Sequence, residues 1–188
     1  MTRDGESLEQ VTDDLSHEMG PSFLSDGKKI SFSSDQTGRF ELYVVTQNQS
    51  GWSEPEQITF GGCSSAKGSY FENTIAFISD EGLRIINVDN KEEKILVESH
   101  DSFEIPRPRF PMWSMDGKIV YYSAVDSRGI ESIWAVPVEG GEPELKIISD
   151  DSYFRLALMG LSTDSRRFYF PMRLIESNVW TMDLMLPK

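Results

Sequence analysis

Residues 21–34 read PSFLSDGKKISFSS, in which an Asp-Gly pair at 26–27 separates two short runs of alternating apolar and polar residues. Asp-Gly is a favoured pair for the tight turn of a β-hairpin. Similar segments recur as SMDGKIVYYSA at 114–124 and STDSRRFYFPM at 162–172. Each contains Ser, a turn centred on Asp, one or two basic residues and an alternating aromatic strand. The hairpin is therefore one copy of a repeated unit.

The segments that follow each copy repeat as well. A weaker copy of the opening segment, SYFENTIAFIS at 69–79, keeps the strand and has Glu-Asn in place of Asp-Gly. The next strands read ELYVVT (41–46), LRIINV (83–88), SIWAVPV (132–138) and NVWTMDL (178–184). A fourth strand closes three units: EPEQITF (54–60), EEKILVE (92–98) and EPELKII (142–148). A period of about 45 residues with four strands per unit is typical of a propeller blade. The repeat therefore predicts an all-β propeller of four-stranded antiparallel blades.

The repeat also predicts how the chain divides within a single propeller domain. Residues 1–13, with a turn and then LEQVT, are expected to form the fourth strand of a blade. The following units are expected at 14–60, 61–98 and 99–149, with three strands of a last blade at 150–188. An N-terminal strand that completes the last blade would remove exposed edges and close a ring. About four blades are therefore expected, either as a closed four-bladed ring or as a fragment of a larger propeller.

These motifs resemble the WD40-like PD40 repeats of TolB-type β-propellers. The first unit carries the resemblance at Pro21, Asp26, Gly27, Lys28, Ile30, Phe32, Gly38, Leu42 and Tyr43. The third unit carries it at Pro111, Trp113, Ser114, Asp116, Gly117, Lys118, Ile119, Ile133, Trp134 and Gly140-Gly141-Glu142-Pro143. The resemblance covers the whole chain and implies a propeller. It points to TolB itself, to sensor domains of bacterial regulators and to the propellers of prolyl-oligopeptidase-like enzymes, and fold does not choose among these functions.

Composition limits the partners. The chain has 188 residues and a formal net charge of −13, which disfavours binding to nucleic acid or to an anionic membrane surface. We expect no membrane insertion, because no stretch approaches the length of a membrane span. The N-terminus lacks an apolar core, so no signal peptide is expected in this chain. A periplasmic or extracellular location would follow only from likeness to exported TolB-type proteins.

Motifs for catalysis are few. The G-x-S-x-G elbow of serine hydrolases is absent, and the sequence has only two histidines and one cysteine. The stretch GGCSSAKGS at 61–69 contains glycines and a lysine without the order of a phosphate-binding loop, so a flexible linker is expected there. No catalytic residue is predicted.

The connections between blades carry the candidate binding site. Three of them place an Asp near a Ser and before an aromatic residue or a histidine, and such connections gather around one mouth of the propeller channel. The candidate binding residues are Asp14, His17, Glu18, Asp101, Arg107, Asp151 and Tyr153. An acidic mouth of this kind would bind a basic peptide or a cation such as calcium, and no other cofactor is expected. The alternative is that Asp and Ser side chains only satisfy turn backbones.

Two further groups of residues have alternative roles. Arg107 and Arg109 in PRPRFPMW are held extended by flanking prolines and are able to bind a partner carboxylate or to pair with Glu104. Aromatic residues at equivalent strand positions are expected to pack between blades, where large side chains fill the space between facing sheets. They are Phe32, Tyr43, Phe77, Tyr122, Trp134, Phe170 and Trp180.

The sequence thus favours a non-catalytic scaffold or sensor propeller that engages a protein or peptide. The alternative is the propeller domain of a larger prolyl-oligopeptidase-like hydrolase whose catalytic domain lies outside this chain. A hydrolase or lyase acting through the propeller itself is disfavoured by the scarcity of histidines.

Overall fold

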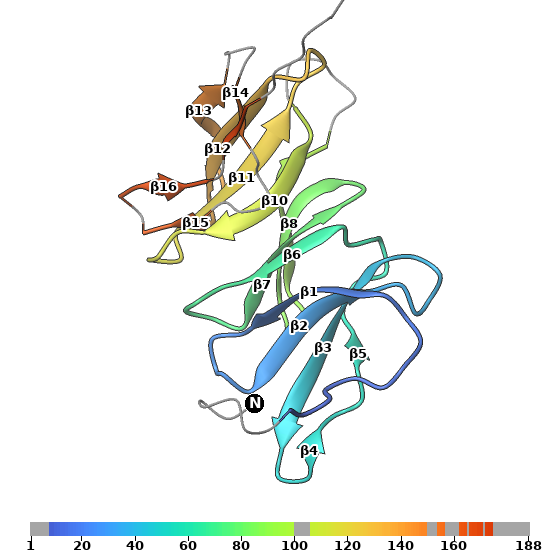
Figure 1. Ribbon diagram of the computed structural model, residues 1–188. Helices are drawn as coiled ribbons and strands as arrows, with labels where there is room; N and C mark the ends of the chain where they lie inside the picture. The colour runs from blue at the N-terminus through green and yellow to red at the C-terminus, as the bar shows by residue number, and fades with distance from the viewer. Residues whose placement is uncertain are drawn as a thin grey trace, which may run out of the picture.

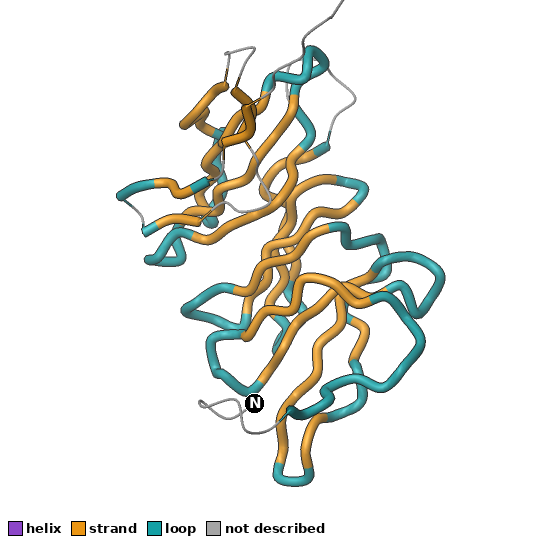
Figure 2. The backbone as a smooth tube through the Cα atoms, in the orientation of Figure 1, coloured by secondary structure: helices purple, strands orange, loops and turns teal. Residues whose placement is uncertain are grey.

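The computed structural model describes residues 8–99, 106–149, 154–156, 162–164, 166–170 and 172–174. These residues form strands and loops with no helix (Figure 2), and so none that could cross a membrane. Three antiparallel sheets follow one another along the chain, from the blue sheet to the yellow sheet in Figure 1. The predicted all-β propeller architecture is confirmed.

The first sheet contains the opening hairpin. Its order is β1-β2-β3-β4, with β5 also paired to β3. The strands are β1 (Glu18–Phe23), β2 (Lys29–Ser34), β3 (Glu41–Asn48), β4 (Gly51–Trp52) and β5 (Glu56–Gln57). The expected fourth strand at 54–60 is thus reduced to two residues, and a short hairpin to β4 extends β3 instead.

The second and third sheets are regular four-stranded meanders. The second contains β6 (Ser65–Gly68), β7 (Thr74–Ser79), β8 (Gly82–Asn87) and β9 (Glu93–Glu98). The third contains β10 (Pro108–Trp113), β11 (Ile119–Val125), β12 (Glu131–Pro137) and β13 (Glu144–Ser149). β10 packs against β6 and β7, which joins the two sheets.

The last unit is described only as paired fragments. β14 (Phe154–Leu156) pairs with β17 (Met172–Leu174), and β15 (Ser162–Thr163) pairs with β16 (Phe168–Tyr169). Both pairings are antiparallel, and β15 and β16 lie between β14 and β17 along the chain. The predicted strand at 178–184 lies outside the described residues.

The glycine-rich stretch at 61–69 differs from its prediction as a flexible linker. Ser65–Gly68 forms β6, the first strand of the second sheet, with every residue paired to β7. Gly68 allows this close packing, because a Cβ there would lie 2.9 Å from Leu24 Cδ2 and 3.0 Å from the Phe23 carbonyl oxygen. A strand with small, polar residues carries no hydrophobic alternation, which is why the sequence pattern did not reveal it.

The N-terminal segment also differs from prediction. Residues 8–13 form no strand, and Val11 packs against Phe32, Tyr43 and Val45 of the first sheet. This segment and the paired strands β14 and β17 lie at opposite ends of the molecule (Figure 1). The prediction that it completes the last blade is therefore wrong for its described part. Contact with the neighbouring aromatic face closes a far shorter loop than reaching across to the last blade.

The core lies between successive sheets. Leu42, Val44 and Ile58 of the first sheet meet Ile75 and Phe77 of the second in one cluster. A second cluster joins Leu83 and Leu96 to Trp113, Val120 and Tyr122 of the third sheet. Each such side chain stabilises the fold by about 1.5–3 kcal/mol on full burial.

Of the aromatic residues predicted to pack between blades, Phe32, Tyr43, Phe77 and Tyr122 are buried, and Trp134 and Phe170 are partly buried against core clusters. Trp180 lies outside the described residues.

Candidate functional site

The antiparallel meander gives the molecule two ends. The connections between sheets and the β2–β3, β7–β8 and β11–β12 loops lie at one end, called here the linker end. The β1–β2, β6–β7, β10–β11 and β12–β13 turns lie at the other, called the turn end. The candidate binding residues predicted from sequence belong to the linker end.

The Asp26-Gly27 turn between β1 and β2 serves packing between blades. Asp26 accepts hydrogen bonds from the Lys29 Nζ at 2.8 Å and from Asn73 Nδ2 of the next sheet at 3.1 Å. Asn73 also donates to Asp89, and Lys29 pairs with Asp89 at 3.1 Å. Partial burial alone would raise the pKa of Asp26, but bonds from Lys29, from the backbone of Lys28 and Lys29 and from Asn73 lower it to about 2. This network joins the turn ends of the first two sheets.

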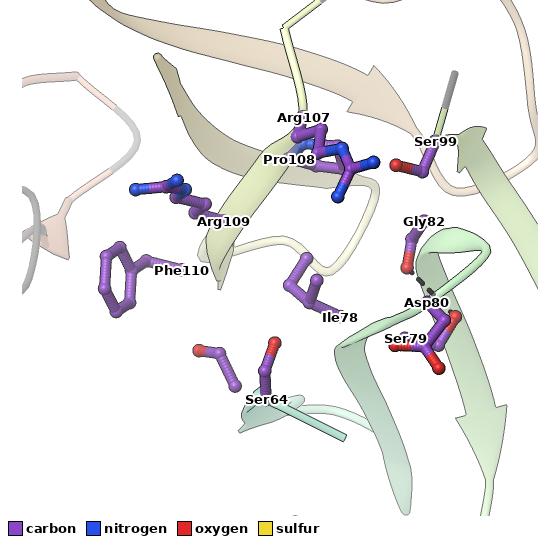
Figure 3. Close-up of a pocket in the computed structure, with 11 residues that line it drawn as sticks. Ser64, Ile78, Ser79, Asp80, Gly82, Ser99, Arg107, Pro108, Arg109 and Phe110 are labelled. Atoms are coloured by element: carbon purple, nitrogen blue, oxygen red, sulfur yellow. Dashed lines mark hydrogen bonds between the residues drawn. The ribbon is translucent and has the colours of Figure 1, made fainter. Parts of the chain in front are cut away.

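A pocket of about 640 Å³ opens at the linker end between the second and third sheets. Figure 3 shows Arg107 and Arg109 on the side of β10, with Ser64 and the β7–β8 turn facing them. Ile78 lies between these walls, and the Ser79 hydroxyl donates to the Gly82 carbonyl at 3.3 Å. The pocket is therefore lined by two arginines and by several small polar residues.

A bulge in β10 positions Arg109. The β10–β11 register shifts between Arg109 and Met112, and Phe110 between them has a φ of 44°. A positive φ is costly for a bulky residue such as Phe110. Phe110 also precedes Pro111, and a residue before proline is normally extended. The strain is held because the Phe110 ring packs against the buried Ile133. Bulges commonly redirect a side chain at a functional site.

Two of the described arginines at the linker end are paired with carboxylates. Arg39 pairs with Asp80 at 3.1 Å, and Arg128 pairs with Asp126 at 2.8 Å. Arg109 has no hydrogen bond or ion pair from its side chain among the described residues, whereas Arg107 does interact with other groups. Arginine binds carboxylates through paired N–H donors, so an exposed, unpaired guanidinium suits an anionic ligand.

The predicted acidic residues that are described lie elsewhere at the linker end. Asp14 accepts the backbone N–H of Ser16 at 2.7 Å, as in the Asx turn considered as the alternative. His17 Nδ1 lies 3.1 Å from Asp35 Oδ2, and its side chain is exposed. Glu18 accepts the Thr12 hydroxyl at 2.5 Å. None of these three lines the pocket that contains Arg107.

Asp101, Asp151 and Tyr153 lie outside the described residues, so their predicted placement at the mouth stays a prediction. Among the residues that the structure describes, no group of three or more His, Cys, Asp or Glu side chains is arranged to hold a metal ion.

Sequence reasoning missed a buried carboxylate at the linker end. Glu41 is 1% exposed and opens β3. Its oxygens accept the Gly62 N–H at 3.0 Å and the Thr59 hydroxyl at 2.7 Å, and Arg39 Nε lies 3.1 Å away. Through Gly62 it anchors the connection to the second sheet. The spacing Arg39-x-Glu41 just before a strand was the available signal.

Known structures resemble this fold at low sequence identity. TolB from Acinetobacter baumannii is 19% identical with a TM-score of 0.58, covering 94% of this chain and 46% of that one. An oligogalacturonate lyase in complex with manganese is 13% identical with a TM-score of 0.56, covering 68% and 39%. An acylaminoacyl peptidase from Pyrococcus horikoshii is 12% identical with a TM-score of 0.53, covering 76% and 26%. This chain therefore spans less than half the length of each.

Sequence comparisons add no closer relationship. No protein-family model matches the chain, and a search of curated proteins finds no match. The structural matches include a TolB, a lyase and a peptidase. Because their sequence identities to this chain are below 20%, they show a shared fold and no shared function. The repeated hairpins, the successive four-stranded sheets and these matches together show that the chain has a TolB-like β-propeller fold.

Proposed function

We propose that this chain is a non-catalytic binding propeller that engages a protein or peptide through the linker-end pocket, where Arg109 binds a carboxylate of the partner. The observation that carries the proposal is the guanidinium of Arg109, which has no partner within the described part of the chain and is set by a strained bulge at the rim of a pocket of about 640 Å³. The likeness to TolB supports a binding role at the level of fold.

The pocket favours an anionic group over the basic peptide expected from sequence. Its described lining contains Arg107 and Arg109 and a single carboxylate, Asp80, which is paired with Arg39. Ser64 and Ser65 add hydroxyl groups that are able to donate to a second oxygen. A charge-assisted hydrogen bond contributes about 1.5–3 kcal/mol, so loss of the Arg109 guanidinium should weaken binding by about tenfold or more.

The proposal is tested by fluorescence anisotropy of a labelled library of acidic hexapeptides against the full chain and against Arg109→Gln. Arg128→Gln is the matched control, because Arg128 is exposed at the same end and already paired with Asp126. We expect an acidic peptide to bind the parent and Arg128→Gln with similar affinity, and to bind Arg109→Gln at least tenfold more weakly. Absence of any acidic peptide bound by the parent, or equal binding by Arg109→Gln, would overturn the proposal.

A second candidate is the propeller domain of a larger hydrolase. The structural likeness to the Pyrococcus acylaminoacyl peptidase favours it, since this chain matches about a quarter of that protein. The full-length gene distinguishes the two. An α/β-hydrolase segment with a G-x-S-x-G motif, joined to this chain, would support the hydrolase, and its serine should then be required for peptide cleavage.

A further inference from the structure

A second cavity lies at the turn end, between the same two sheets and away from the linker-end pocket. Its volume is about 710 Å³, and the β6–β7, β10–β11 and β12–β13 turns line it. The first two of these turns project to the same side in Figure 1. A neighbouring hollow of about 690 Å³ shares Thr74, Ile85, Val138 and Glu139 with it, so the two form one continuous cleft. We call this the turn-end cleft.

The floor of the turn-end cleft is apolar and already satisfied in its hydrogen bonds. Trp113 is 3% exposed, and its indole N–H donates to the Lys67 carbonyl at 2.8 Å. Ile85 and Val138 belong to the same core cluster as Trp113. A ligand therefore meets hydrocarbon at the base of the cleft, as in most small-molecule sites, which combine an apolar lining with a few polar groups.

An exposed aromatic ring covers one side of the cleft. Phe71 is 58% exposed although it lies against the Asp116–Gly117 turn. A Cβ at position 117 would lie 3.1 Å from Phe71 Cδ2, and Gly117 has a φ of 70°, so glycine serves both the turn and the ring. The aromatic ring is thus placed by contact with the neighbouring blade while most of its surface stays open to a ligand.

The rim of the cleft carries carboxylates from both sheets. The lining includes five carboxylates and two ammonium groups. Several of these are engaged: Asp116 accepts from Ser114, Glu93 pairs with Arg84, and Lys94 donates to the Val138 carbonyl at 2.9 Å. Glu72 of the β6–β7 turn and Glu139 of the β12–β13 turn have no hydrogen bond or ion pair within the described part of the chain.

We propose that the turn-end cleft binds an amphipathic cation, a ligand with an aromatic or aliphatic body and one amine or guanidinium group. The apolar body lies on the floor made by Trp113 and Ile85, and Phe71 covers it. The cationic group pairs with Glu72 and Glu139, and the Phe71 ring adds a cation–π interaction. The same chemistry is available from a free amine or from a lysine or arginine side chain of a peptide.

The proposal is tested by ¹H–¹⁵N correlation spectra of the full chain titrated with 2-phenylethylamine. We expect saturable shifts at residues 69–74, 113–119 and 137–139. The neutral analogue 2-phenylethanol and the small cation ethylammonium should each bind at least tenfold more weakly. A second arm uses the acetylated amide of Phe-Arg: tighter binding than the free amine assigns the ligand to a peptide, and weaker binding assigns it to a free amine.

Variants separate the cleft from non-specific charge effects. Glu72→Gln and Glu139→Gln should each weaken 2-phenylethylamine binding about threefold or more, and the double variant about tenfold. Phe71→Ala should weaken it as well, because the apolar cover and the cation–π interaction are both lost. Glu54→Gln is the matched control, since Glu54 is exposed and lines neither hollow. Shifts confined to the linker end, equal binding of the neutral alcohol, or unchanged binding by the double variant would overturn the proposal.

Discussion

Replacement of Glu41 by Ala is expected to be among the most destabilising single changes at the linker end. The Glu41 carboxylate is buried and accepts hydrogen bonds from Gly62 and Thr59, both of which belong to the connection between the first two sheets. In the variant the Gly62 N–H and the Thr59 hydroxyl would lose their acceptor where the protein excludes water. Arg39 is half-exposed and would be solvated instead.

The expected magnitude follows from the two buried donors. Each buried donor left without an acceptor costs about 1–3 kcal/mol, so we expect a loss of about 3 kcal/mol or more in the free energy of unfolding. For a chain of this size 1 kcal/mol corresponds to about 2–4 °C in Tm, which predicts a decrease of about 10 °C. Glu41→Gln keeps one acceptor oxygen and should give an intermediate loss.

The assay is unfolding of the full chain in guanidinium chloride, followed by tryptophan fluorescence. Glu131→Ala is the matched control, because Glu131 opens β12 as Glu41 opens β3. Its buried Oε2 has no hydrogen-bond partner among the described residues, so its removal orphans no donor and should cost less than about 1 kcal/mol. Equal destabilisation by the two substitutions would refute the role assigned to the Glu41 hydrogen bonds.

Two further predictions concern titration and reactivity. Because the pKa of Asp26 in the folded state is lowered to about 2, its contribution to stability is present above about pH 4 and is lost as the pH falls towards 2. Asp26→Asn should therefore be less stable than the parent at pH 6 and lose less Tm between pH 4 and 2, and parallel Tm profiles for the two proteins would contradict this. Burial raises the pKa of the Cys63 thiol to about 11, so we expect the native protein at pH 8 to react with a disulfide reagent orders of magnitude more slowly than the protein unfolded in guanidinium chloride. Comparable labelling rates in the two conditions would show that Cys63 is accessible in the native state.

The candidate site was only partly predictable from sequence. Prolines around Arg107 and Arg109 marked an unusual basic segment, and the structure places both arginines at one pocket. The carboxylate of Asp14 instead accepts the backbone N–H of Ser16 in its own turn, a local hydrogen bond that Asp side chains commonly make. Glu72 and Glu139 gave no signal, since they come from turns 67 residues apart that only the packing of the second sheet on the third brings to one cleft.

The sequence by itself determined the blade, because hydrophobic alternation and Asp-centred turns are local properties that repeat wherever a four-stranded sheet repeats. It determined neither the role of Ser65–Gly68 nor the position of residues 8–13. A strand of small residues forms only where its neighbours supply the hydrogen bonds and the space. Only the tertiary structure decided these points. It also decided which charged residues meet at the linker-end pocket and at the turn-end cleft, because both lie between sheets.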